Sequence, residues 1–300
     1  MPTRLRFESN IADGTSVYID LARAMSKVQR KLVRQGQNFV IHGGLIQDSN
    51  NGYTLRFNTA PQSWVVGTAL RRAKKMWDLQ YKQALSEGGL GRLKPKYWDW
   101  KVYLDAAHAN GAATISPVDA AGTGYPGGEW IYSKFASEDV DWSNPALLTS
   151  ANRNADEFTA HIVGQHNGSS SDWESVGIIE SWRDSRPEPD QDEPDTPNEA
   201  AILADPLVNL FDEADADDER LIHVMQFGDN PPYDEDRVPG DGSGTVGLER
   251  MAMAATSTAN PIVSFGGFVA PHGLIQVNAT RASDGNVTIL MDVEAVGGIY

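Results

Sequence analysis

The pattern of apolar and polar residues predicts a protein built mainly of strands, with two helices near its start. In residues 16–35, apolar side chains recur every three or four positions, which is typical of an amphipathic helix. Residues 63–87 repeat this spacing, with Leu70 and Trp77 on the apolar stripe and Ser63 as a suitable N-cap. We therefore expect a helix in each segment.

Most of the remaining chain has the alternation and the turn residues of strands. We expect strands at 38–47, 53–58, 98–106, 129–136, 158–165, 175–182, 220–227 and in the segments after 248. Asn51-Gly52 and Asp284-Gly285 are typical of two-residue hairpin turns, so each predicts a hairpin between its flanking strands. The first strands of these hairpins carry two similar strings, HGGLIQ at 42–47 and HGLIQV at 272–277.

These elements indicate a mainly β protein, a sandwich of two antiparallel sheets with one or two helical insertions in the N-terminal third. Regular strand–helix alternation is absent after residue 90, which disfavours a parallel α/β fold. We expect a single domain, 1–300, with a basic N-terminal segment at 1–37, an inserted helix at 62–90 and exposed acidic loops at 184–199 and 230–244. We also expect strand 38–47 to lie beside 286–293.

Charge divides the chain more sharply than its net value of −16 suggests. The first 101 residues carry 17 Lys and Arg against 7 Asp and Glu, whereas the remaining residues carry 8 against 34. Such asymmetry predicts two surfaces with different neighbours, of which the basic one attracts a polyanion. A salt-adapted acidic surface with an incidental basic cluster is the alternative.

Composition and motifs exclude several kinds of chemistry. The chain has no cysteine, no apolar run long enough to span a bilayer and no apolar signal region in MPTRLRFESN. No phosphate-binding loop, nucleophile elbow or zinc-protease motif is present, and we expect a protein that is not an enzyme. His161 and His166 are five residues apart, which places them on opposite faces of a strand, so we expect them to be structural.

Candidate ligand-binding residues fall into a basic group and an acidic group. Basic side chains release counterions when they neutralise phosphates, so the basic group predicts binding of a nucleic acid. It comprises Arg4, Arg6, Arg23, Lys27, Arg30, Lys31, Arg34, Arg71, Arg72, Lys74, Lys75 and Lys82. Trp64, Trp77 and Tyr81 are candidates for stacking on bases, although the stripe position of Trp77 favours the core. Asp212, Asp215 and Asp217 are candidate calcium ligands, but a solvated acidic surface is the favoured interpretation.

Several segments, in order along the chain, resemble the capsid proteins of circular Rep-encoding single-stranded DNA viruses, above all those of environmental and marine origin. They include YIDLARAMSKVQRKLVRQGQNFVI, SWVVGTALRRAKKMWDLQY, KPKYWDWKVYLDAAH, FTAHIVG and GGFVAPHGLIQV. The resemblance implies a jelly-roll subunit of the virion that assembles with copies of itself into an icosahedral shell around single-stranded DNA. It implies no enzymatic residues. The absence of a long apolar run predicts no membrane partner, and the acidic group leaves calcium at subunit contacts as the one cofactor under consideration. Many members have a long Arg-rich N-terminal arm, whereas MPTRLRFESN offers only Arg4 and Arg6, so DNA contact would depend on the later basic residues.

Two other functions compete with a shell subunit. A β-sandwich lectin or adhesin, calcium-dependent or not, would use the eight tryptophans and the acidic loops. A jelly-roll enzyme of the cupin or glycosidase type would need clustered histidines and carboxylates, which HIVGQH does not supply.

Overall fold

The computed structural model describes residues 2–48, 52–88, 97–139, 154–169, 172–185, 232–233, 238–242 and 247–298. The chain divides into two units, of which the first comprises residues 1–185 and 238–300 and the second residues 186–237. Apart from 232–233, all of the described residues belong to the first unit, and so do all of the described helices and strands.

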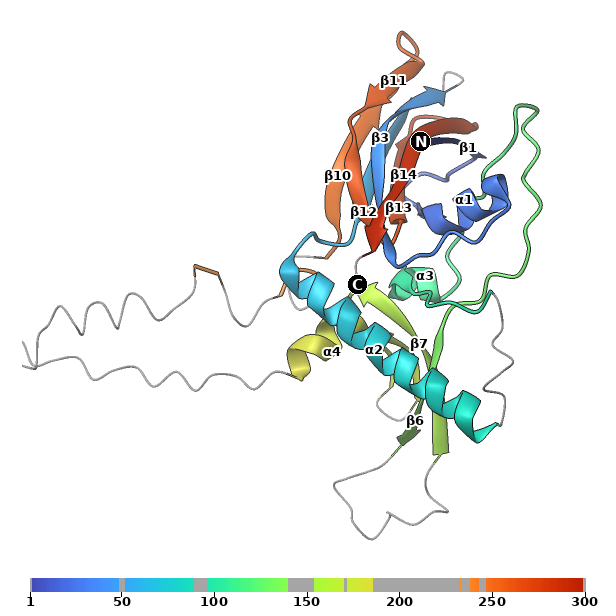
Figure 1. Cartoon of the computed structure of the whole chain (residues 1–300). Coiled ribbons are helices and arrows are strands. Elements are labelled where there is room, and N and C mark those ends of the chain that lie inside the picture. Colours follow the sequence, from blue (N-terminus) through green and yellow to red (C-terminus); the bar gives the residue numbers. More distant parts are fainter. Residues whose placement is uncertain are drawn as a thin grey trace, which may run out of the picture. The chain divides into compact units, whose positions relative to one another are not determined.

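Two antiparallel sheets form the β-sandwich (Figure 1). The first sheet has the order β1-β14-β3-β11, with β12 also paired to β3, and the second has the order β10-β4-β13-β2. Their bounds are β1 Thr3–Ser9, β2 Ser16–Asp20, β3 Gln37–Asp48, β4 Tyr53–Thr59, β10 Glu249–Ala255, β11 Ile262–Phe265, β12 Phe268–Pro271, β13 Leu274–Arg281 and β14 Val287–Gly298. The predicted fold class, a mainly β protein with a sandwich of antiparallel sheets, is confirmed.

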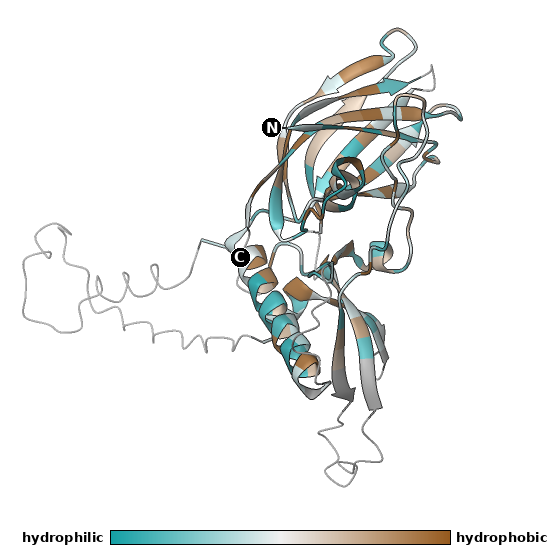
Figure 2. Ribbon diagram, turned by 45° about the vertical axis from the view of Figure 1, so that its right-hand side comes forward, coloured by the Kyte–Doolittle hydropathy of each residue, from teal (hydrophilic) through white to brown (hydrophobic). Residues whose placement is uncertain are grey.

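Alternation along the strands builds the core between these sheets. In β4, Tyr53, Leu55 and Phe57 are buried, while the residues between them are partly exposed. The same two-residue period operates in β14, where Ile289 and Met291 are buried, and Figure 2 shows this alternation of hydropathy on the strands. Because successive side chains of a strand point to opposite faces, each sheet contributes one apolar face to a shared core.

The predicted neighbours 38–47 and 286–293 are confirmed. β3 and β14 pair antiparallel along nearly their whole length, with Leu45 opposite Leu290 and Ile46 opposite Ile289. The segment that contains HGGLIQ therefore lies at the centre of its sheet, between β14 on one side and β11 and β12 on the other.

Both predicted hairpins are wrong. β3 and β4 lie in different sheets, and so do β13 and β14, so neither turn joins paired strands. Gly52 does have a positive φ of 63°, as such a turn requires. Turn chemistry marks where a chain reverses, but it does not decide whether the next strand pairs beside the first or crosses to the facing sheet.

The first predicted helix begins later than expected. Residues 16–20 form strand β2, and only α1, Leu21–Gln29, is helical. Four of the five residues of β2 are buried, because β13 pairs with its edge and side chains pack on both of its faces. The predicted basic segment 1–37 thus contains two strands of the sandwich, β1 and β2, together with helix α1, which packs on the sandwich.

The described residues of the first unit between β4 and β10 form a second layer of structure with its own core. It contains α2 Trp64–Glu87, β5 Tyr103–Asp105, α3 Ala106–Ala109, β6 Lys134–Asp139, β7 Asn154–Val163, β8 Asn167–Ser169, β9 Asp172–Gly177 and α4 Ile178–Asp184. The strands make a third sheet in which β5 and β9 both pair with β7 in parallel, and α2 contacts α4 and β6 (Figure 1). We refer to the described residues among 60–185 and 238–248 as the insertion.

The insertion departs from the sequence expectations in three ways. Its strands form a separate sheet, although we expected them in the sandwich. The predicted strand 175–182 is a strand only to Gly177 and a helix from Ile178, whereas the predicted helix at 63–87 and its cap Ser63 are confirmed. Val238 and Asp241 are buried, so the loop at 230–244, which we expected to be exposed, is buried near its C-terminal end. Most of the other predicted acidic loop, residues 186–199, lies outside the described residues.

Gly44 tests the packing of the sandwich. An added Cβ at Gly44 would lie 2.3 Å from the Leu290 carbonyl oxygen and 2.2 Å from the Phe265 ring. We expect Gly44→Ala to lower the free energy of unfolding by about 1–3 kcal/mol, measured by urea denaturation, because neighbouring strands must move apart. Gly67 in α2 is the matched control, since nothing lies within 4 Å of an added Cβ there. Gly67→Ala should raise stability by about 0.5–1 kcal/mol, and equal effects of the two substitutions would contradict this packing.

Candidate nucleic-acid interface

Helix α1 presents its basic residues on the face opposite to the sandwich core. Asp20 is its N-cap and accepts a hydrogen bond from the Arg23 backbone N–H at 2.9 Å. Leu21, Ala22, Ala24 and Met25 are buried against the sandwich. The helix ends at Arg30, which adopts the left-handed conformation with φ 53°. Helical spacing then leaves Arg23, Lys27 and Arg30 on the outer side.

The buried carboxylate of Asp20 fixes both this helix and the chain segment that faces it. Besides the Arg23 N–H, it accepts hydrogen bonds from Gln35 Nε2 at 2.9 Å, Trp130 Nε1 at 3.1 Å and Tyr132 Oη at 3.4 Å. Burial raises the pKa of Asp20, while these donors and the Arg23 charge favour the ionised form. A single carboxylate thus connects β2, α1, the segment after α1 and residues 130–132.

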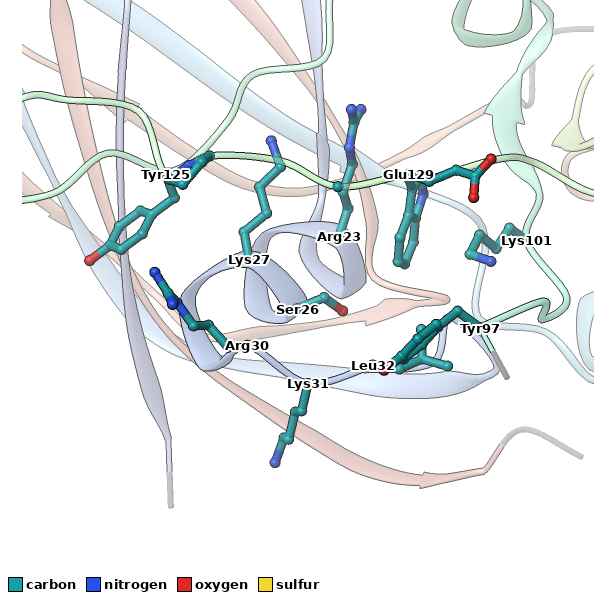
Figure 3. A pocket seen from close by; sticks show the side chains of 13 residues that line it. Arg23, Ser26, Lys27, Arg30, Lys31, Leu32, Tyr97, Lys101, Tyr125 and Glu129 are labelled. Carbon is teal, nitrogen blue, oxygen red and sulfur yellow. The ribbon is translucent and has the colours of Figure 1, made fainter. Parts of the chain in front are cut away.

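A pocket of about 340 Å³ lies beside α1, between the helix and segments 97–101 and 125–130. We refer to it as the α1 pocket. Its lining includes five basic side chains and one carboxylate, that of Glu129, together with the rings of Tyr97, Tyr125 and Trp130. Figure 3 shows these side chains coming from three separate parts of the chain. The basic ones are Arg23, Lys27, Arg30, Lys31 and Lys101.

The electrostatic environment of the α1 pocket is positive and partly desolvated. Burial, and then the charge of Arg23, lowers the pKa of Lys27, whose Nζ donates to Ser116 Oγ at 2.8 Å. Burial likewise lowers the pKa of Lys101, whose Nζ lies 4.9 Å from the centre of the Trp130 ring. The buried Nε of Arg23 has no hydrogen-bond acceptor among the described residues. An anion in this pocket would find several donors with favourable charge.

Arg4, Arg6 and Arg34, which we predicted as nucleic-acid contacts, do not line this pocket. Arg4 makes two hydrogen bonds of 2.7 Å to the carboxylate of Asp292 on the paired strand. Arg6 contacts the Glu8 carboxylate and the backbone carbonyls of Asp119 and Ala120. Arg34 is exposed, with its Nε 3.7 Å from Asp99. The guanidinium groups of Arg4 and Arg6 thus serve the structure of the sandwich.

A second basic surface runs along α2. Val66, Leu70 and Trp77 face the core of the insertion, so the outer face carries most of the cations. Arg71, Arg72, Lys75 and Lys82 are exposed there, while the Lys74 ammonium is paired with Asp78 at 2.6 Å. Arg72 also donates to Ser185 Oγ. We refer to these four exposed side chains as the α2 basic face.

The aromatic candidates for base stacking, Trp64, Trp77 and Tyr81, are mainly structural. Trp77 is buried and stacks on Tyr81 with ring centres 5.3 Å apart. Trp64 is 61% exposed, although its ring also contacts Trp182 edge-on. Tyr97, Tyr125 and Trp130, which line the α1 pocket, were missed, because no local sequence pattern brings these distant segments to α1.

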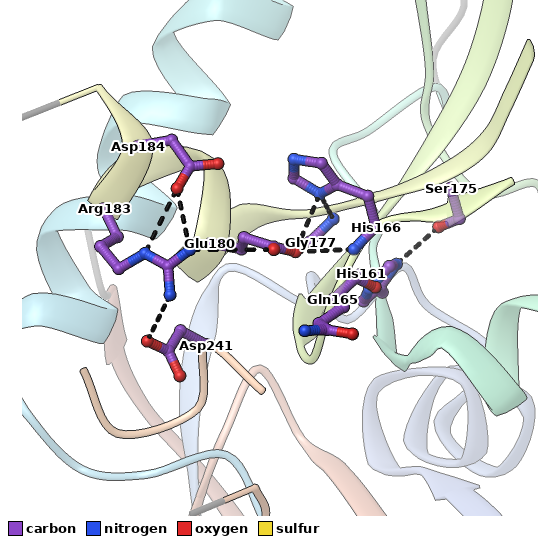
Figure 4. A network of polar contacts seen from close by, with 9 residues as sticks. All are labelled: His161, Gln165, His166, Ser175, Gly177, Glu180, Arg183, Asp184 and Asp241. Carbon is purple, nitrogen blue, oxygen red and sulfur yellow. Dashed lines mark hydrogen bonds and ion pairs between the residues drawn. The ribbon is translucent and has the colours of Figure 1, made fainter. Parts of the chain in front are cut away.

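Hydrogen bonds and packing occupy the described histidines of the insertion. His161 is buried, with Nδ1 2.8 Å from Ser175 Oγ and Nε2 3.0 Å from the Gln165 carbonyl (Figure 4). His166 Nδ1 accepts from the Gly177 N–H at 3.0 Å, which requires this nitrogen to be unprotonated, although Glu180 lies 3.3 Å away. His108 stacks on Tyr18 with ring centres 4.5 Å apart. All three have structural contacts, which is the role that we expected for His161 and His166.

The histidines of the two similar strings differ in environment. His42 is an exposed residue of β3, and its Nε2 lies 3.1 Å from Glu294. His272 is fully buried in the turn between β12 and β13, with φ 58°, so the prediction that it belongs to a strand is wrong. Burial lowers its pKa to about 3.

Within the described residues, no group of three or more His, Asp or Glu side chains is placed to hold a metal ion. Asp212, Asp215 and Asp217, the calcium candidates, and His223 lie outside the described residues, so their roles stay predictions. The described helices include none whose length and apolar character would suit a membrane crossing. No protein-family model, curated protein or solved structure matches the chain.

Acidification tests the neutral state of the buried His161. Burial lowers its pKa to about 4 in the folded protein, whereas an unfolded histidine titrates near 6.5. The unfolded chain therefore binds the proton first. Stability from the neutral ring is fully present above about pH 6.5 and is lost as the pH falls toward 4.

We expect wild-type protein to lose about 2 kcal/mol more than His161→Gln between pH 7.5 and pH 5, measured by urea denaturation at each pH. Comparing the two proteins cancels the titration of other groups, including Asp20 and Asp105, whose pKa values burial raises. Parallel stability curves for wild type and His161→Gln would show that this histidine does not titrate as described.

Proposed function

We propose that this protein is a capsid subunit whose jelly-roll sandwich assembles into an icosahedral shell and binds single-stranded DNA through its basic surfaces. The role is structural, not enzymatic, and its location is the virion. The partners are copies of the same chain and the DNA genome. Calcium at subunit contacts, through Asp212, Asp215 and Asp217, stays a prediction.

The pairing of the sandwich strands is the observation that carries this proposal. With β11 and β12 taken as one interrupted strand, the sandwich has eight strands in chain order. The first pairs with the eighth, the second with the seventh, the third with the sixth and the fourth with the fifth, all antiparallel. Such nested pairing results when one long hairpin rolls up into two sheets, and this supports a jelly roll.

Jelly rolls occur in capsids, lectins and cupins, so the fold alone does not choose between them. Two features of this chain favour the shell. The first is the α1 pocket, whose five basic side chains suit a polyanion better than a neutral glycan. The second is the α2 basic face, which adds four exposed cations on a long helix. The sequence resemblance to single-stranded DNA virus capsids agrees with both features.

Expression followed by negative-stain electron microscopy tests assembly directly. We expect closed, uniform particles whose ratio of absorbance at 260 nm to that at 280 nm exceeds the ratio for protein alone, and nuclease-resistant DNA within them. A protein that stays monomeric across a range of salt and pH would refute the shell. Particles free of nucleic acid under all conditions would refute the packaging role.

Salt dependence tests which cations contact DNA. We expect Lys75→Gln/Lys82→Gln to lower the slope of log affinity for single-stranded DNA against log salt by about 1.4, because each phosphate contact contributes roughly 0.7. Arg4→Gln should leave the slope unchanged, since Arg4 is paired with Asp292. Fluorescence anisotropy of a labelled oligonucleotide measures both. A larger change in Arg4→Gln than in the double variant would contradict the assignment of the α2 basic face.

A further inference from the structure

The α1 pocket combines three properties that are rarely found together on a solvated basic surface. It is concave, with a volume of about 340 Å³, which lies within the range of pockets that hold small ligands. It gathers five cations against one carboxylate. Aromatic rings form part of its wall. An anion with an attached flat ring matches all three properties.

Two cations of the pocket are close enough to affect each other, because the charge of Arg23 contributes to lowering the pKa of Lys27. Gly127 lies directly against Lys27, since an added Cβ there would be 3.2 Å from the lysine Cε. Burial and then the charge of Arg23 lower the pKa of His108, so the field of this guanidinium reaches beyond the pocket. Arg30 is exposed at the end of α1, and it lines the pocket together with Tyr125 (Figure 3). Bound phosphate would relieve the repulsion between these side chains.

Hydrogen bonds position two of the aromatic residues, Tyr125 and Trp130. The backbone N–H of Tyr125 donates to the Pro117 carbonyl at 3.0 Å, which anchors the segment while its ring lines the pocket. Trp130 is anchored through Nε1 to Asp20, and the Lys101 ammonium lies over its ring. Of these two rings, Tyr125 is the better platform for a ligand ring, because the Trp130 ring already has a cation against it.

We propose that the α1 pocket binds one unpaired nucleotide of single-stranded DNA, with its phosphate among Arg23, Lys27 and Arg30 and its base stacked on Tyr125. This inference rests on the proposed function and specifies how the DNA is held. Stacking needs a base whose face is free, so the pocket distinguishes single strands from duplex DNA. The α2 basic face, in contrast, attracts both forms through charge alone.

Tyr125→Leu isolates stacking, because it removes the ring without changing charge. With the full-length chain and a labelled oligothymidylate as the probe, we expect binding to weaken by about 5- to 150-fold, as for loss of one base–aromatic stack. Affinity for duplex DNA and the salt slope should stay as in wild type. Tyr125→Phe keeps the ring and should bind as wild type does, provided that both variants unfold at the wild-type temperature.

Lys27→Gln/Arg30→Gln tests the phosphate contacts, with Lys75→Gln/Lys82→Gln on α2 as the charge-matched control. Both double variants should lower the salt slope by about 1.4. In wild type, thymidine monophosphate should compete with the labelled oligothymidylate, and inorganic phosphate should compete more weakly. Only the α1 variant should abolish competition by the nucleotide. Wild-type affinity in Tyr125→Leu, or nucleotide competition that survives in the α1 variant, would overturn the inference.

The same experiments separate this inference from the shell proposal. Tyrosine-dependent binding of single strands by a chain that forms no particles would support the pocket and refute the capsid. DNA-filled particles with wild-type packaging in Tyr125→Leu and in Lys27→Gln/Arg30→Gln would support the capsid and refute the pocket. Tighter binding of a sulfated polysaccharide than of oligothymidylate, unaffected by Tyr125→Leu, would assign the pocket to another polyanion and overturn the inference.

Discussion

The buried carboxylate of Asp20 is the constraint on which the candidate interface depends. It ends β2, caps α1 and accepts hydrogen bonds from Gln35 and Trp130, which belong to different parts of the chain. A buried charge is tolerated only when donors surround it, so these partners must stay where they are. The side chain that orders the pocket is therefore a buried acid, although the pocket itself is basic. Loss of Asp20 would leave these donors without their acceptor.

A second buried contact joins the insertion to the sandwich through the same strand. Tyr18 lies two residues before Asp20, on the same face of β2, and its hydroxyl lies 2.8 Å from both carboxylate oxygens of Asp105. Gln276 of β13 donates to that carboxylate at 3.0 Å. The opposite face of β2 sends Val17 and Ile19 into the sandwich core. A short strand at the edge of its sheet thus carries apolar packing on one face and the polar links to the insertion on the other.

This double burial explains which elements the sequence predicts and which it does not. The alternation in β4 and β14, and the stripe of α2, each arise from one buried face, and these elements were predictable. β2 is buried on both faces, so its residues resemble the start of a helix. At Gly52 and at Asp284-Gly285 the chain crosses from one sheet to the other. Predicting these crossings requires knowing where the facing sheet lies. The sequence identifies the cations of the α1 pocket that lie on or next to α1. It does not identify Lys101, Tyr125 and Trp130, which only the tertiary structure brings to the pocket.

In the proposed function, a shell subunit holds single-stranded DNA by both charge and stacking, and the nested strand pairing and the basic pocket are the observations behind this proposal. Ultraviolet crosslinking of DNA-containing particles, with the crosslinked peptides identified by mass spectrometry, tests this account most directly, because it reports contacts within the assembly. We expect crosslinks to Tyr125 and its neighbours in segment 124–130. Particles that contain DNA but crosslink only through other segments would contradict this account.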